Sequence, residues 1–178
     1  MIVYQRKNIQ APGKTQTAST LGAISALLDL SYNLYLMAHN SELQEKLIKR
    51  LKDLNQFLGA HYEIQVAAFC IQAGFEITLE DEDDPNSTHC EFTATNIKNG
   101  RKFSVEAKAR THGKNSGAIS SQLYSALKKS AEHERIIFIN INIAEKTTNL
   151  ESTQWIQEAI NSIRGAETRL KINGKEAP

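Results

Sequence analysis

The dipeptide Asn99-Gly100 is the feature that most constrains the fold of this chain. Asn-Gly between two runs of alternating apolar residues is typical of a tight β-hairpin, because both residues readily adopt positive φ angles. The flanking runs, Cys90–Ile97 and Lys102–Ala109, are therefore predicted to be neighbouring antiparallel strands.

The register of this hairpin decides which side chains share a face. A two-residue loop places Glu91 opposite Lys108. It also places Thr93 opposite Glu106. Since side chains alternate between faces, these residues share one face, with two carboxylates and an ammonium within about 5–8 Å of one another. The other face is apolar and is expected to join the core; it carries Phe92, Ala94, Phe103, Val105 and Ala107.

Hydrophobic periodicity predicts helices on both sides of the hairpin. Leucines recur at helical spacing from Leu43 to Leu58, and a break near residues 55–59 would divide this stretch into two helices. Asn40-Ser41 is a candidate cap at its start, and Ser41 and Gln44 have capping-box spacing. The apolar pattern runs on through Cys70 to Gly74, a candidate C-cap. The full order is α-α-β-β-β-α-β-α. Besides the leucine-rich stretch, helices are predicted at Leu21–Met37, Ile119–His133 and Ser152–Ile163. Strands are predicted at Phe75–Leu79, Cys90–Ile97, Lys102–Ala109 and Ile136–Ile143, with optional short strands at Ile2–Tyr4 and Arg169–Ile172.

Glu91, Glu106 and Lys108 form the candidate chemical centre. Two carboxylates this close repel each other unless a cation lies between them. Mg²⁺ takes oxygen ligands, usually one or two carboxylates with waters and substrate phosphate oxygens. A nearby lysine could orient the attacking water or stabilise charge that develops on a phosphoryl group. The three residues therefore supply the parts for metal-assisted phosphodiester hydrolysis.

The stretch Val105-Glu106-Ala107-Lys108-Ala109 ends a strand after a glycine-containing hairpin, and it resembles the ExK half of the PD-(D/E)xK nuclease motif. Cys90-Glu91-Phe92 lies where that family carries its first acidic residue. The stretch Leu58–Glu63 resembles the early helix that contributes a glutamate in many members. The family core is α-β-β-β-α-β, and the elements predicted for residues 57–143, about half of the chain, follow that order. The resemblance implies an α/β fold with a central mixed sheet flanked by helices, an N-terminal arm and helical extension over residues 1–56, and a nuclease-like domain over residues 57–178.

The resemblance also implies a role for each matching residue on the hairpin. Glu91 and Glu106 would hold Mg²⁺, for which Mn²⁺ would substitute, and the backbone carbonyl of Ala107 would be a third ligand. Lys108 would assist the nucleophilic water. The family usually has Pro-Asp where this chain has Cys90-Glu91, and the extra methylene moves the carboxylate by about one bond length. Asp83 or Asp84 would replace Glu91 if the hairpin register differs.

Two residues outside the hairpin resemble family positions. Glu63 would touch a second metal, bridge to it through water, or orient Lys108. Gln122 resembles a glutamine found early in the following helix of several subfamilies. It does not form a Q-x-x-x-Y pattern, because Tyr124 is only two residues further on.

Charge is balanced over the whole chain but uneven along it. The formal net charge is +1, which gives no general attraction to nucleic acid or membrane. From Lys98 to Lys129 there are eight Lys or Arg residues and one acid, whereas Glu76 to Glu91 contains seven acids and no Lys or Arg. The basic segment is a candidate surface for nucleic acid, although ordinary surface charge is the alternative. DNA is expected rather than RNA only as part of the nuclease hypothesis.

The remaining features bear on cellular context. Cys70 and Cys90 are too few for a disulfide framework and lack zinc-site spacing. Residues 1–20 contain no apolar stretch typical of a signal peptide, and charged Asp29 interrupts Leu21–Met37. We therefore expect a cytoplasmic protein with reduced thiols and no membrane span, and a homodimer if it cuts duplex DNA.

The sequence thus predicts a metal-dependent nuclease, with two other function classes left open. The first is a catalytically inactive module of the same fold that binds nucleic acid or a protein partner, which the Cys90-Glu91 departure favours. The second is an unrelated α/β protein whose N-terminal helices mediate association. The residues also have structural alternatives: Glu106 and Lys108 could be a solvated strand face that is salt-bridged to Glu91, and Glu63 could be a surface residue on an amphipathic helix.

Overall fold

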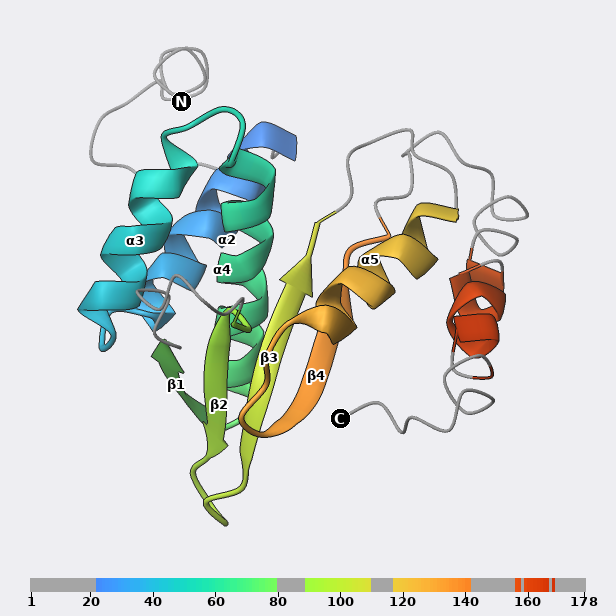
Figure 1. The fold of residues 1–178 in the computed structure, drawn as a ribbon. Coiled ribbons are helices and arrows are strands. Elements are labelled where there is room, and N and C mark those ends of the chain that lie inside the picture. The colour runs from blue at the N-terminus through green and yellow to red at the C-terminus, as the bar shows by residue number, and fades with distance from the viewer. Residues whose placement is uncertain are drawn as a thin grey trace, which may run out of the picture.

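The computed structural model of the chain describes residues 22–79, 89–109, 117–141, 156–157, 159–166 and 168. These residues contain a mixed four-stranded sheet of order β1-β2-β3-β4 (Figure 1). Strands β1 (Phe75–Leu79), β2 (Phe92–Asn96) and β3 (Lys102–Lys108) form an antiparallel meander, and β4 (Glu134–Ile139) runs parallel to β3. The α/β class predicted from the sequence is confirmed.

The helices lie largely where hydrophobic periodicity predicts them. They are α2 (Gly22–Leu36), α3 (Ser41–Leu51), α4 (Phe57–Gln72) and α5 (Gly117–Lys128), and the described residues between 156 and 168 are also helical. The predicted break in the leucine-rich stretch is confirmed, since α3 ends before residue 55. Helix α5 ends earlier than predicted, because the chain turns there toward β4. The predicted strands at residues 2–4 and 169–172, and the candidate ligands Asp83 and Asp84, lie outside the described residues.

Asn40 begins α3 and also ties that helix to the sheet. Its side-chain oxygen accepts a hydrogen bond from the backbone N–H of Leu43 at 3.0 Å, and its amide nitrogen donates to the carbonyl of Ile77 at 2.9 Å. Asn is among the best N-cap residues because this bond satisfies an otherwise unpaired helix donor. Of the predicted Asn40-Ser41 cap, Asn40 is confirmed as the N-cap residue, and the capping box of Ser41 with Gln44 is wrong because the cap lies one residue before Ser41.

The Asn99-Gly100 hairpin is present, but its register differs from the prediction by two residues. Thr93 pairs with Ser104 rather than with Glu106. Glu91 follows the same register, with its N–H donating to the strand β3 backbone at 2.9 Å, so that it lies beside Glu106 and not opposite Lys108. A shift by an even number of residues leaves every side chain on its predicted face. The composition of the two faces is therefore as predicted, and only the partners across the strands change.

The register differs because the connecting loop is longer than two residues. The N–H of Asn96 donates to the carbonyl of Arg101 at 2.8 Å, so residues 97–100 form the loop. The Asn96 side chain accepts hydrogen bonds from the N–H groups of Lys98 and Asn99, a local arrangement that begins the turn early. Gly100, at φ +70°, supplies the left-handed residue that returns the chain to β3.

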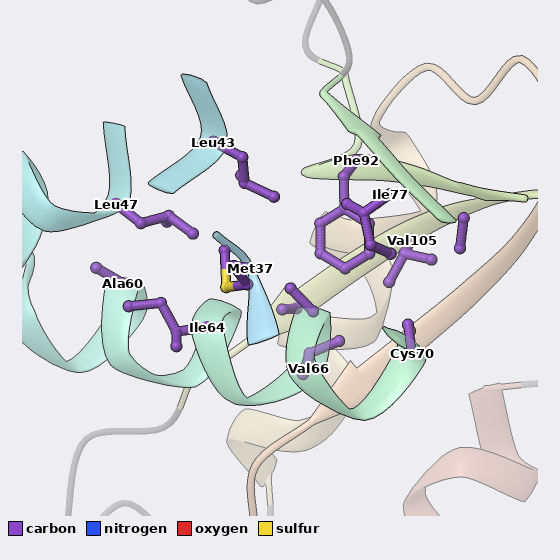
Figure 2. Close-up of a cluster of buried hydrophobic side chains, with 13 residues drawn as sticks. Met37, Leu43, Leu47, Ala60, Ile64, Val66, Cys70, Ile77, Phe92 and Val105 are labelled. Atoms are coloured by element: carbon purple, nitrogen blue, oxygen red, sulfur yellow. The ribbon is translucent and has the colours of Figure 1, made fainter. Parts of the chain in front are cut away.

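One hydrophobic core lies between α4 and the sheet (Figure 2). Phe92 of β2 is its largest fully buried side chain. Met37, Leu43 and Leu47 enter the same core, so the N-terminal helices pack directly against α4 and the sheet. The leucine stripe does not continue through Leu54, which is 93% exposed because it follows the end of α3.

The two faces of the sheet are covered by different helices. Phe138 of β4 meets Phe69 of α4 edge to face, with ring centroids 5.9 Å apart. The adjacent Ile137 instead lines an apolar cavity with Ile119 of α5. Successive strand residues point to opposite faces, so α4 covers the core face and α5 covers the other (Figure 1). Glu106, which pairs with Ile137 across the strands, lies on the α5 face.

Cys70 and Cys90 are both buried and form no disulfide, and burial raises the pKa of the Cys70 thiol to about 11. Within the ranges that the structure describes, no helix is both long and apolar enough to cross a membrane.

Candidate active site

The candidate site lies where β2 begins and β3 ends. Antiparallel pairing brings Glu91, just before β2, to the same end of the sheet as Glu106 and Lys108 of β3. Lys129, the first residue after α5, reaches this end from the crossover between β3 and β4. The structure thus brings together the three hairpin residues predicted from the sequence and adds a second lysine.

Glu106 is fully buried and is held by both lysines. The Lys108 ammonium pairs with its Oε1, and the Lys129 ammonium lies 3.0 Å from its Oε2. The same Lys129 nitrogen lies 3.0 Å from Oε1 of Glu91, so that one cation bridges the two carboxylates. Burying a carboxylate is costly unless it is paired, and the two lysines supply that compensation.

The pKa shifts follow from this crowding of buried charge. Burial raises the pKa of Glu106, and repulsion from Glu91 adds to the rise, although Lys108 and Lys129 both oppose it. For Lys129, burial lowers the pKa of the ammonium, but attraction to Glu91 and Glu106 outweighs burial and the net pKa is raised. Lys129 is therefore firmly protonated, and the two carboxylates share its charge.

Glu63 is buried rather than exposed, and its partner is Arg50. One guanidinium nitrogen of Arg50 donates to Glu63 Oε1 at 2.7 Å, and the other pairs with Oε2, which makes a bidentate contact between α3 and α4. Burial raises the pKa of Glu63 despite the hydrogen bonds from Arg50. Glu63 and Arg50 line a small cavity together with Glu91, so the pair borders the carboxylate site. The surface alternative for Glu63 is wrong.

Gln122 and Ala107 lie at the same end of β3 as the carboxylates. The Gln122 amide nitrogen donates to the carbonyl of Ala109 at 3.2 Å, one residue beyond Lys108. The amide oxygen of Gln122 is buried and has no hydrogen-bond partner among the described residues. The side chain of Ala107 is buried in the core, on the face opposite Glu106.

Arg50 and Lys129 belong to the site, although neither was predicted from the sequence as a site residue. Lys129 belongs to the basic segment expected to meet nucleic acid, but its charge, like that of Lys108, is used inside the protein. Arg101 of the same segment pairs with Glu134. The basic segment therefore offers fewer charges to a ligand than its composition indicates.

Glu91 and Glu106 are the candidate donors for a divalent cation. No group of three or more His, Cys, Asp and Glu side chains within the described ranges could hold a metal ion. Glu91 and Glu106 nonetheless converge on one positive charge, because each places an oxygen 3.0 Å from the Lys129 nitrogen. Mg²⁺ commonly takes one or two protein carboxylates and completes its shell with water and substrate oxygens. The two glutamates fit such a cation as a donor pair if Lys129 gives way.

Comparisons with models of protein families, with curated proteins and with solved structures found no match.

Proposed function

We propose that this protein is a Mg²⁺-dependent nuclease of the PD-(D/E)xK type that hydrolyses phosphodiester bonds, with DNA as its expected substrate. The observation that carries the proposal is the buried carboxylate of Glu106 beside Glu91, with Lys108 on the same face of the sheet. The element order α4-β1-β2-β3-α5-β4 supports it, because this is the core order that the motif implies.

Each residue has a specific task in the proposed reaction. Glu91 and Glu106 would hold the cation, with the Ala107 carbonyl as a further ligand, and the bound cation would stabilise negative charge on the phosphoryl group. Lys108 is positioned by its ion pair with Glu106, and its ammonium would orient the attacking water. Glu63, neutralised by Arg50, would hold the wall of the cavity beside Glu91.

The test is cleavage by the purified protein of single- and double-stranded DNA and RNA, with Mg²⁺, with Mn²⁺ and with chelator. The Lys108→Ala variant is compared with Lys102→Ala, which removes an exposed lysine from the same face of the same strand. We expect metal-dependent cleavage by the wild type and by Lys102→Ala. In Lys108→Ala the cleavage rate should fall at least about 100-fold, because one positioned catalytic group usually contributes that much. Equal cleavage by all three proteins would locate the activity elsewhere.

A second candidate function is a catalytically inactive module that binds nucleic acid or a protein partner. The bridging position of Lys129 favours it, since the two carboxylates already have an internal cation. This alternative predicts salt-sensitive DNA binding without cleavage, and no rise in melting temperature on addition of Mn²⁺.

A further inference from the structure

Lys129 bridges both carboxylates of the proposed metal site. Its nitrogen lies 3.0 Å from Glu91 Oε1 and 3.0 Å from Glu106 Oε2, whereas Lys108 pairs with the other oxygen of Glu106. The Lys129 ammonium thus stands where the two carboxylates converge, which is the position that a divalent cation would need. The Lys129 ammonium and a divalent cation cannot both occupy that position.

The backbone around Lys129 is anchored from several sides. The Lys129 carbonyl accepts a hydrogen bond from the Arg135 guanidinium at 2.6 Å. The next residue, Ser130, forms an isolated β-bridge with His89, and its carbonyl accepts from the Cys90 thiol at 3.5 Å. Cys90-Glu91, the pair that departs from the usual Pro-Asp, therefore contacts the 129–130 segment through both of its side chains.

The Lys129 side chain can nevertheless leave the carboxylates without moving this backbone. Its side chain is 21% exposed, whereas Glu106 is fully buried. Lysine has a flexible four-carbon stem and a strongly hydrated ammonium, so rotation about its side-chain bonds would take the charge toward solvent. The anchored backbone keeps the ammonium close by, and the carboxylates would recover their partner when the site empties.

We propose that Lys129 is an intramolecular competitor of the divalent cation, which neutralises Glu91 and Glu106 in the metal-free protein and must be displaced before the metal binds. The role rests on the proposed function, because competition requires that a metal use the same two carboxylates. Its consequence is a site that stays closed at low metal concentration and keeps two neighbouring carboxylates from destabilising the empty protein.

The test measures Mn²⁺ binding directly by isothermal titration calorimetry, without substrate. Lys129→Met removes the competing charge and keeps most of the side-chain volume. Lys128→Met is the matched control, because Lys128 is the exposed neighbouring residue at the end of α5. An opposite charge at this range lowers the affinity of a carboxylate for a proton about tenfold or more, and we expect an effect at least as large on a divalent cation. We therefore expect the Kd for Mn²⁺ to fall at least about tenfold in Lys129→Met and to stay within about twofold in Lys128→Met.

A second readout is the melting temperature. Without metal, Lys129→Met should melt below the wild type, because Glu106 keeps only one of its two cations; with saturating Mn²⁺ it should gain more than the wild type does. Lys129→Gln keeps a donor at the position and serves if the methionine variant does not fold.

The outcomes separate the competitor role from the proposed function. Equal Mn²⁺ affinity in wild type and Lys129→Met would overturn the competitor role and leave the metal site standing. Weaker binding in Lys129→Met would also overturn it, because the lysine would then support the metal rather than oppose it. Absence of Mn²⁺ binding in the wild type and in both Lys129 variants would overturn the competitor role and the proposed function together.

Discussion

The ion pair between Arg50 and Glu63 offers a sharp test of how buried charge is compensated in this protein. The Glu63 side chain is 8% exposed and the Arg50 side chain is 26% exposed. Arg50→Met would leave the Glu63 carboxylate buried without its bidentate partner. Removing one partner of a buried ion pair typically costs about 3–5 kcal/mol. Because water reaches part of Arg50, we expect a loss of about 2–3 kcal/mol in the free energy of unfolding.

The reverse change should cost much less. In Glu63→Gln no buried charge remains, and Arg50 can turn toward the solvent that it already contacts, so the expected loss is about 1 kcal/mol. The double variant Arg50→Met/Glu63→Met replaces both charges with apolar side chains of similar volume and should lie within about 1 kcal/mol of the wild type. Lys49→Met, an exposed change in the same turn of α3, is the control and should stay within about 0.5 kcal/mol.

The assay is urea unfolding at pH 7 followed by far-ultraviolet circular dichroism. A loss of about 2–3 kcal/mol corresponds to a fall in Tm of about 5–10 °C for a chain of this size. If Arg50→Met is as stable as Glu63→Gln, an unpaired buried charge at Glu63 is not the cause of the loss. The same conclusion follows if the double variant is as unstable as Arg50→Met.

The pH dependence of Arg50→Met provides an internal check. Burial already raises the folded-state pKa of Glu63 above its ordinary value of 4.5, and loss of Arg50 would raise that pKa further. A raised pKa means that the folded state binds the proton more tightly, so stability is lost as pH rises through the folded pKa. Well below pH 4.5, the carboxyl is protonated in both the folded and the unfolded state. The deficit of Arg50→Met should therefore shrink as the pH is lowered from 7 toward 4.5.

Four further predictions follow from single residues. Phe92→Ala empties the largest fully buried position and should cost about 3–5 kcal/mol in urea unfolding. Asn40→Ala removes the α3 cap and its bond to β1 and should cost about 1–2 kcal/mol, whereas Ser41→Ala should cost less than about 0.5 kcal/mol if Asn40 is the true cap. Gly100→Ala places a Cβ at φ +70° and should lower stability by about 1 kcal/mol, measured in the same way. Because the folded-state pKa of Glu106 is raised, the free energy of unfolding of the metal-free protein should fall as pH rises from 4.5, the ordinary pKa of glutamate, through the folded-state pKa. Glu106→Gln should show a smaller fall, and the same pH dependence in both proteins would contradict a raised pKa at Glu106.

The sequence by itself determined the elements and the composition of each sheet face. Alternation with a period of two places Glu106 and Lys108 together and puts Val105 and Ala107 on the other side. This division of side chains between the two faces is correct although the predicted hairpin register is wrong, because a shift by two residues keeps every side chain on its face. The register itself could not be read from Asn-Gly alone, since the Asn96 side chain begins the turn earlier.

Only the tertiary structure decided which charges meet. Lys129 is 38 residues from Glu91 in the chain, and Arg50 is 13 residues from Glu63 on a different helix. No local periodicity encodes such pairs, because their geometry depends on where α3 and α5 come to rest against the sheet and α4. That placement is set by the packing of apolar side chains. The charged residues that meet are therefore known only once the chain is folded. Packing also decided that Glu63 and Glu106 are buried. Because a buried carboxylate is costly unless it is paired, burial is the reason that both need cationic partners.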